Sequence, residues 1–589
     1  MTQDTGFPIV WLVLVAIFIV CAVISFSVVM EDAFISFRYA ENIAAGFGPV
    51  FNRYGPQVEG FSDPLWVGLL AIARLLGFSV IAAARYMGLF FGAMVLLEFI
   101  LLFRLTAPGR NFGATAALVV ATMPAFVFWS PAGLENALYI WLLFSSVRLA
   151  ILEVRDPGRF EFSTLTLFLL AVTRPEGIMF FLIIATWRFL ESWKYRERFT
   201  WGRTWGWFIA VLVLYGLFLV WRHQVFGEWV ANTFFAKVNN GMRHNLRVGA
   251  LYLLSCMNHT LWLPLLVPGF LAYVYRSSIR GQARTILKAI LPLALIQIVF
   301  ILYVGGDIHP VDRFFLPVYL LSIAISFLLL PEFKKVAFRK NGSMWLAVVL
   351  LIGNLTYSFP PSTGIEPPMS RPPSMLAANL AGLISGRLKP IDVVNRFKSP
   401  PADAFELVGR DLAANPEVGP VIAADQCGKI PYWSGLETID LLGLNDRGIA
   451  RIMHSVSPWG VYATEVLNRM PDTFILAYRN KRLISRYYLE NTVLSEPFRT
   501  RYVLDATYRA EYRMYDIAGI EHSFSLELVR FKLISHGSKS LLSDDEIRWF
   551  DDHQPVTENP GALSDMVETF RAQHAGDADR VITYSVPMN

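Results

Sequence analysis

The sequence predicts a polytopic α-helical membrane protein with a soluble α/β domain in its C-terminal part. Hydrophobic residues make up 54% of the 589 residues, charged residues make up only 17%, and the mean hydropathy is +0.44. Soluble domains, in contrast, are about a quarter charged. The apolar residues gather in long runs before residue 358, and a mixed pattern follows. These observations exclude a disordered chain, a soluble multidomain enzyme and a nucleic-acid-binding protein as first interpretations.

The first apolar run covers residues 7–30. It is longer than the core of a signal peptide and lacks a small-residue cleavage site, so we expect a retained membrane anchor. A span needs about 20 apolar residues, and fewer where a helix is short or broken. The later runs cover approximately 81–103, 112–130, 134–152, 162–173, 178–190, 205–221, 248–275, 289–304, 314–330 and 344–358. The stretch 64–78 is shorter and is interrupted by Arg74, so it either spans or lies at the membrane interface.

Short basic loops between spans indicate the cytoplasmic side. Five such segments are Arg104/Arg110, Arg148/Arg155/Arg159, Lys194/Arg196/Arg198/Arg203, Arg276/Arg280/Arg284/Lys288 and Lys334/Lys335/Arg339/Lys340. All five fall on one side if 64–78 does not cross and 162–190 crosses twice, with a break around Pro175. We therefore expect about 11 transmembrane helices, with the N-terminus inside and everything after residue 358 outside. The basic external loop 222–247 is an exception to the rule.

After residue 358 the composition changes. Residues 359–374 are rich in Pro and Ser and are typical of a linker. The predicted domains are a transmembrane domain over 1–358, which includes a first external loop over 31–80 with juxtamembrane helices, and an external soluble domain over 375–589. Within the external domain, VIAAD (421–425) and TIDLLGL (438–444) are expected to be buried strands.

The predicted topology places most of the unusual polar segments on the outer face. They are the segment 31–52, GLEN (133–136), TRPEG (173–177), ANTFFAK (231–237) and GGDIHPVDRF (305–314). Ionisable groups near membrane depth are costly and therefore indicate function. Taken singly, Glu135 could be a helix N-terminal acid, Arg174 a snorkelling anchor and Asp307 a turn former. Their convergence on one face favours a functional site.

The chemistry of this outer set suits transfer of a group from a lipid phosphate to a hydroxyl. Glu31 and Asp32 are adjacent carboxylates at the end of the first span, and a carboxylate can act as general base. The cations on the same side, which can hold a phosphate, are Arg174, Lys237, His309 and Arg313. Five aromatic residues could either stack on a sugar or anchor an amphipathic helix. Their helical spacing favours the anchoring role. They are Phe34, Phe37, Tyr39, Phe47 and Phe51.

Several motifs resemble the GT-C superfamily of membrane glycosyltransferases. The segment EDAFISFRYAENIAAGFGPVFN (31–52), an acidic pair and the motif that follows it, is most similar to the arabinofuranosyltransferases of mycobacterial cell-wall synthesis, which use decaprenyl-phosphate-linked arabinofuranose. Supporting motifs are VEGFSDPLW (58–66), AGLENAL (132–138), TRPEG (173–177), NTFFAK (232–237), GGDIHPVDRFFLP (305–317) and GKIPYWSGLETIDLLGLND (428–446). The resemblance covers the whole chain in order. It implies an inverting transferase acting outside the cytoplasmic membrane with a polyprenyl-phosphate sugar as donor.

The family's usual acidic pair is Asp-Asp, whereas this chain has Glu31 and Asp32. Asp32 matches the member expected to be the base, and Glu31 shares the catalytic prediction. Our hypothesis is one in-line displacement, in which Arg174, Lys237, His309 and Arg313 surround the donor phosphate. The departing phosphate is a stable anion, so no general acid is required, unlike in glycosidases. The residues predicted to bind sugar or acceptor are Glu135, Glu176, Asn232 and Asp307.

No metal site is predicted, and no cofactor is expected to be required. Asp32 with Glu31 or Asp307 could hold Mg²⁺ or Ca²⁺, but no ligand spacing demands it. The three cysteines form neither a metal-binding spacing nor a disulfide framework. The expected partners are a polyprenyl-phosphate sugar donor, a glycan or glycoprotein acceptor and the lipid bilayer, and not nucleic acid. In the external domain, Tyr432 and Trp433 are candidate acceptor contacts, while Asp425 and Asp440 are more typical of buried strand ends.

Three alternatives remain open from the sequence. A GT-C enzyme could transfer mannose, glucose or aminoarabinose instead of arabinofuranose. A lipid-linked-sugar transporter or flippase would also have many spans, but it typically has internal pseudo-repeats with paired helix breaks, and only one break is found. A non-catalytic scaffold would need no charges converging on one face. The expected location is the bacterial cytoplasmic membrane, with the active site and the C-terminal domain on the periplasmic side of the cell envelope.

Overall fold

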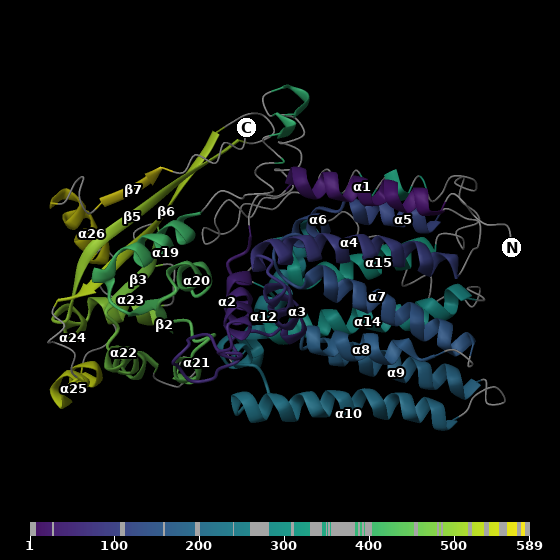
Figure 1. Cartoon of the computed structure of the whole chain (residues 1–589), viewed down its shortest axis with the longest axis horizontal. Coiled ribbons are helices and arrows are strands. Elements are labelled where there is room, and N and C mark those ends of the chain that lie inside the picture. Colours follow the sequence, from purple (N-terminus) through teal and green to yellow (C-terminus); the bar gives the residue numbers. More distant parts are fainter. Residues whose placement is uncertain are drawn as a thin grey trace.

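The computed structural model describes most of both halves of the chain. The described residues are 7–25, 29–105, 112–156, 160–194, 201–238, 241–259, 282–307, 311–329, 403–452, 458–479, 482–483, 487–515, 521–534, 541–552, 562–573, 579–583 and scattered positions between 344 and 394. The predicted linker 359–374 and the predicted phosphate ligand His309 lie outside this set. Within it, a helical bundle adjoins a domain built on a mixed sheet (Figure 1).

The helices of the bundle run alongside one another (Figure 1). They are α1 (Phe7–Ser25), α4 (Val80–Arg104), α5 (Phe112–Ala121), α6 (Pro124–Trp129), α7 (Asn136–Arg155), α8 (Phe162–Thr173), α9 (Gly177–Lys194), α10 (Trp201–Phe226), α12 (Met242–His259), α14 (Gln282–Val304) and α15 (Leu316–Leu329). Among the described residues, four helices are long and apolar enough to cross a membrane: α4, α7, most of α10 and most of α14. A helical membrane architecture is therefore supported, and the count of 11 spans stays a prediction.

Two features of the predicted topology agree with the observed helices. The chain breaks around Pro175, because α8 ends at Thr173 and α9 begins at Gly177, and these two helices pack against each other. Helix α3 (Pro64–Leu75) has 12 residues, which at 1.5 Å per residue span about 18 Å, short of the roughly 30 Å hydrocarbon core. It packs mainly against α2 (Ala33–Ala44), as a juxtamembrane helix does.

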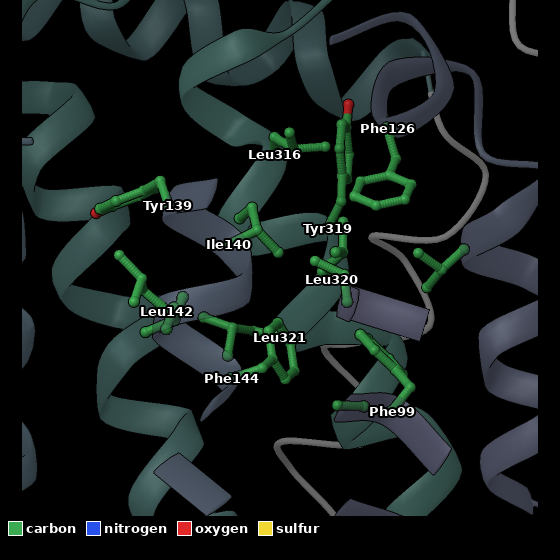
Figure 2. Close-up of a cluster of buried hydrophobic side chains, with 14 of the residues drawn as sticks. Phe99, Phe126, Tyr139, Ile140, Leu142, Phe144, Leu316, Tyr319, Leu320 and Leu321 are labelled. Atoms are coloured by element: carbon green, nitrogen blue, oxygen red, sulfur yellow. The ribbon is translucent and has the colours of Figure 1, made fainter. Parts of the chain in front are cut away.

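The bundle core is apolar and closely packed. Figure 2 shows part of it, where aromatic and aliphatic side chains of α4, α6, α7 and α15 meet. The rings of Phe99 and Phe144 lie 4.7 Å apart. Gly88 allows the closest backbone approach nearby, because a Cβ there would lie 1.8 Å from the carbonyl oxygen of Ser130. This packing fixes the ends of the helices, where the polar segments lie.

The C-terminal domain contains a seven-stranded sheet. Its strands are β1 (Val421–Ala424), β2 (Glu437–Asp440), β3 (Thr473–Arg479), β4 (Arg482–Leu483), β5 (Tyr502–Tyr515), β6 (Glu521–Leu533) and β7 (Asp579–Thr583). The main order is β2-β1-β3-β6-β5-β7, with β4 paired to β3. β1 is parallel to β2 and β3, whereas β6 is antiparallel to β3 and β5. The two strands expected at 421–425 and 438–444 are therefore present as neighbours.

Helices surround this sheet (Figure 1). They are α19 (Ala404–Ala414), α20 (Lys429–Ser434), α21 (Arg447–Ile452), α22 (Pro458–Asn468), α23 (Tyr487–Leu494), α24 (Glu496–Arg499), α25 (Asp544–Asp552) and α26 (Ala562–Gln573). Two separate clusters of buried apolar side chains belong to the domain. It therefore has its own core, as a soluble α/β domain requires.

Helix α2 lies at the boundary between the bundle and the C-terminal domain (Figure 1). Nine of its twelve residues are buried. The ring of Phe34 lies 5.2 Å from that of Tyr432 on α20. The aromatic residues of this segment therefore pack a helix in place, as their spacing favours. The surface they pack against includes the C-terminal domain and not lipid alone. Phe47, at 41% exposed, is the exception.

Candidate functional site

Asp32 lies in the turn directly before α2, at the end of the bundle that meets the C-terminal domain. Its side chain does not cap α2. The carboxylate Oδ2 lies 3.5 Å from Nζ of Lys237, and these side chains are 22% and 43% exposed. Lys237 belongs to the short helix α11 (Asn232–Val238). The predicted base and one predicted phosphate ligand are therefore neighbours, and both are accessible.

Glu31 has a different environment from its neighbour Asp32. Its Oε1 accepts hydrogen bonds from the backbone N–H groups of Gly428 (2.9 Å) and Lys429 (3.0 Å). Burial raises the pKa of Glu31 to about 7, against the opposing effect of the Lys429 cation. Lys429 itself pairs with Asp403. The side chain predicted to share the catalytic role is thus held by the C-terminal domain.

Arg174 is almost buried, at 8% exposed, between α8 and α9. Its Nε donates to Glu176 Oε1 at 2.6 Å, and its Nη1 pairs with Glu135. Two of the predicted sugar ligands therefore bind the predicted phosphate ligand in this structure. Two carboxylates therefore share one guanidinium, and an incoming phosphate would compete with them for its N–H donors.

Arg313 forms a bidentate pair with Asp307, at 2.7 and 3.1 Å. Both arginines contact the ring of Phe314, because the guanidinium carbons of Arg174 and Arg313 lie 5.2 and 5.1 Å from its centroid. Arg313 is also within electrostatic reach of Asp32 and Glu135. The structure thus brings these predicted site residues together at one end of the bundle.

The hydrogen-bond partners of Asn232 differ from those of Arg174 and Arg313. Its Nδ2 donates to the carbonyl oxygens of Gly443 and Leu444, both at 2.8 Å. Its backbone N–H donates to the carbonyl oxygen of Glu59 at 3.0 Å. Asn232, which is predicted to bind sugar or acceptor, therefore connects the start of α11 to the C-terminal domain.

Asp63 is a site residue that sequence reasoning missed. It is buried in the first external loop, and Ser36 Oγ donates to both of its carboxylate oxygens, at 3.1 and 3.0 Å. Burial, together with the nearby negative charge of Glu135, raises the pKa of Asp63 to about 8. It belongs to the VEGFSDPLW motif, in which it stands before Pro64 and resembles an ordinary helix-starting residue.

We expect the free energy of unfolding of Asp63→Asn to increase relative to that of wild type as the pH rises from about 4 to about 8. The pKa of a buried Asp63 exceeds its ordinary value of 3.8. The native state therefore holds the proton more tightly than the unfolded state, and the stabilisation it provides is lost as the pH rises. Asn carries no titrating proton and can still bond Ser36. Thermal unfolding of both proteins in detergent across this range measures the difference, expected to be at least about 1 kcal/mol.

A difference between the two proteins that is independent of pH would contradict a protonated Asp63. Asp505→Asn is a matched control, because Asp505 lies in the C-terminal domain and pairs with Arg530 at 2.5 Å. It should not reproduce the trend.

No group of three side chains suited to a metal occurs among the described residues. Asp307, one of the acids that could hold Mg²⁺ or Ca²⁺, is paired with Arg313. Glu31, another, faces the amides of Gly428 and Lys429. That no metal is required stays a prediction.

The acceptor candidates in the C-terminal domain divide as expected. Asp425 is fully buried and accepts the backbone N–H of Ala477 at 3.1 Å. Asp440 binds the backbone N–H groups of Leu442, Gly443 and Asn445. Both are strand-end acids: Asp425 bonds the neighbouring strand β3, and Asp440 supports the turn after β2. Tyr432 and Trp433 are half-buried and pack at the boundary with α2.

Comparisons with known proteins bear on the fold of this chain. Residues 402–526 match the model of a family described as a domain of unknown function, DUF8728. No curated protein matches the sequence. ArnT from Cupriavidus metallidurans bound to undecaprenyl phosphate is 13% identical, with a TM-score of 0.51, covering 90% of this chain and 98% of that chain. The Archaeoglobus fulgidus oligosaccharyltransferase in complex with zinc and sulfate is 14% identical, with a TM-score of 0.45, covering 86% and 72%.

The likeness to ArnT extends over nearly the full length of both chains. At this identity it shows a shared fold. Membership of the GT-C superfamily and of its arabinofuranosyltransferase subfamily stays a prediction from the sequence resemblance.

Proposed function

We propose that this protein is an inverting membrane glycosyltransferase that moves a sugar from a polyprenyl-phosphate donor to an acceptor hydroxyl. The observation that carries the proposal is the pair Asp32–Lys237. An accessible carboxylate lies 3.5 Å from an accessible ammonium group, at the end of a bundle that includes helices long and apolar enough to cross a membrane. Carboxylate and cation side by side suit a reaction that removes a proton from one substrate and leaves a phosphate on the other.

In this mechanism Asp32 accepts the proton of the acceptor hydroxyl as its oxygen attacks the anomeric carbon. The bond between that carbon and the phosphate oxygen breaks on the opposite face, so the anomeric configuration inverts. Polyprenyl phosphate leaves with one additional negative charge. Lys237 is well suited to stabilise this charge, since its side chain is 43% exposed and its Nζ lies 3.5 Å from Asp32.

Arg313 and Arg174 are also proposed to bind the donor phosphate, but each is already paired with carboxylates in this structure. Arg313 is bound by Asp307 and Arg174 by Glu135 and Glu176. A donor phosphate would compete with these carboxylates, which would then be released toward the hydroxyl groups of the sugar. This exchange accounts for the presence of both cations and acids in the cluster, and it assigns Asp307, Glu135 and Glu176 to the sugar.

The donor sugar proposed is D-arabinofuranose. This choice rests on the motif resemblance in the first external loop, EDAFISFRYAENIAAGFGPVFN. The site is proposed to face the outside of a bacterial cytoplasmic membrane, because the short basic loops of the sequence lie on the other side of the predicted topology. The acceptor is proposed to be a glycan or glycoprotein of the cell envelope.

We expect purified protein in detergent to transfer arabinofuranose from its synthetic polyprenyl-phosphate donor to an arabinose-type acceptor. The same carrier lipid with mannose, glucose or aminoarabinose should react at least tenfold more slowly, because the site carboxylates bind a particular arrangement of hydroxyl groups. Product formation by chromatography and mass spectrometry measures both rates. Preference for another of these sugars would replace the donor and leave the reaction class in place.

A transporter is the rival from a different class. Reconstituted in liposomes, a transporter would move labelled lipid-linked sugar between leaflets without breaking the sugar–phosphate bond. The present account predicts cleavage of that bond only when acceptor is present.

A further inference from the structure

We propose that residues 428–445 of the C-terminal domain position the Asp32–Lys237 pair, with Glu31 and Asn232 as the positioning residues. The inference rests on the proposed function for what the pair does, but the mechanical link can be tested without substrate. It would give the C-terminal domain, which includes the 402–526 family match, a role in catalysis as well as any role in acceptor binding.

The first link acts on the carboxylate. Glu31 precedes Asp32 in the chain, and its Oε1 is held by the backbone N–H groups of Gly428 and Lys429. The contact is tight, because a Cβ on Gly428 would lie 2.1 Å from the carbonyl oxygen of Glu31. A backbone that is held at residue 31 limits where the side chain of residue 32 can go.

The second link acts on the cation. Asn232 is the first residue of α11, and Lys237 lies on the same helix. The Asn232 side chain donates to the carbonyl oxygens of Gly443 and Leu444. The chain entering α11 is held as well, since Arg447 donates to the carbonyl oxygen of Phe226 and Arg451 pairs with Glu228.

The turn after β2 that holds Asn232 also contacts α2, the helix that follows Asp32. Asp440 Oδ2 accepts the backbone N–H of Asn445 at 2.7 Å and its Nδ2 at 3.0 Å. Asn445 Oδ1 in turn lies 3.3 Å from the hydroxyl of Tyr39 on α2, which donates to the carbonyl oxygen of Val58 at 2.6 Å. The turn after β2 thus contacts α2 and α11 together, so a shift of this turn would move both members of the pair.

The contact of Glu31 with both amides also accounts for the longer acid at this position, where the family that the sequence resembles has Asp. An Asp side chain is one methylene shorter and would not reach both amides from the same backbone position. We therefore expect Glu31→Gln, which keeps the length and the acceptor oxygen, to preserve the link, and Glu31→Ala to abolish it.

The test is hydrogen–deuterium exchange on the full chain in detergent. Glu31→Ala should speed amide exchange at least tenfold in both 428–434 and 29–37, and Asn232→Ala should do so in 232–238 and 440–446. Glu31→Gln should restore wild-type protection. Glu161→Ala is the control, because Glu161 pairs with Arg188 at 2.7 Å at the opposite end of α8 and should leave all four segments unchanged.

Exchange that rises in 428–434 while 29–37 stays protected would overturn the proposal. If Glu31→Ala fails to fold, Gly428→Ala disturbs the same contact from the other partner and carries the same expectation. Where wild type transfers sugar, Glu31→Ala should also lower kcat about tenfold while Glu31→Gln stays within about twofold of wild type. A wild type without transfer would contradict the proposed function alone, because the exchange results stand without substrate.

Discussion

Replacing Asp32 by Asn is expected to lower kcat for glycosyl transfer by about 10²–10⁴-fold, the usual contribution of a general base. This corresponds to a barrier raised by about 3–5 kcal/mol. Asn has the same shape and is itself favourable before a helix, and Asp32 does not cap α2, so the fold should be retained. The affinity for donor should change much less, because the phosphate is assigned to cations.

The control for Asp32→Asn is Asp505→Asn, the same chemical change in the C-terminal domain, which should leave kcat within error of wild type. Unfolding temperatures of both variants establish that loss of rate is not loss of structure. An Asp32→Asn protein that keeps more than a tenth of wild-type kcat would remove Asp32 as the base. Glu31 would then be the next candidate, although its carboxylate is held by Gly428 and Lys429.

Replacing Arg38 by Ala is expected to have the largest effect on stability. The buried guanidinium on α2 donates to the carbonyl oxygens of Phe51 (2.7 Å) and Leu436 (2.8 Å), to Asn52 Oδ1 (3.1 Å) and to the carbonyl oxygen of Pro431. Each buried acceptor left without a donor costs about 1–3 kcal/mol. We therefore expect a loss of about 3–5 kcal/mol and separation of the C-terminal domain from α2.

Thermal unfolding in detergent, followed by tryptophan fluorescence, measures this loss. Arg74→Ala is the matched control, because Arg74 lies on the neighbouring helix α3 and its guanidinium forms a solvent-exposed pair with Glu41. It should unfold at the wild-type temperature. Equal unfolding temperatures for the Arg38 and Arg74 variants would show that the α2 contacts do not hold the two domains together.

Much of the architecture could be predicted because it depends on local patterns. The break at Pro175 follows from proline chemistry and from the charge pattern of the loops, and it appears as the gap between α8 and α9. The two parallel strands β1 and β2 follow from short apolar runs bounded by turns. Asp32 could be chosen because two acids directly after a span are rare.

The roles of Glu31 and Asn232 could not be predicted because their partners are remote in sequence. Glu31 meets an amide 397 residues further along the chain, and Asn232 meets carbonyl oxygens more than 200 residues away. A sequence does not show which backbone N–H or C=O groups a side chain will contact. From the sequence, both side chains therefore resemble substrate ligands. Asp63 was missed for a related reason, since its burial depends on how α2 packs over the first external loop.

The central claim is tested most directly by measuring polyprenyl phosphate released from polyprenyl-phosphate arabinofuranose by the purified wild-type protein, with and without an arabinose-type acceptor. The account predicts release that depends on acceptor, matches glycosylated product one to one, and falls at least about a hundredfold in Asp32→Asn. Well-folded protein that releases no polyprenyl phosphate from this donor or from its mannose, glucose and aminoarabinose counterparts, while moving the intact lipid across liposome membranes, would contradict it.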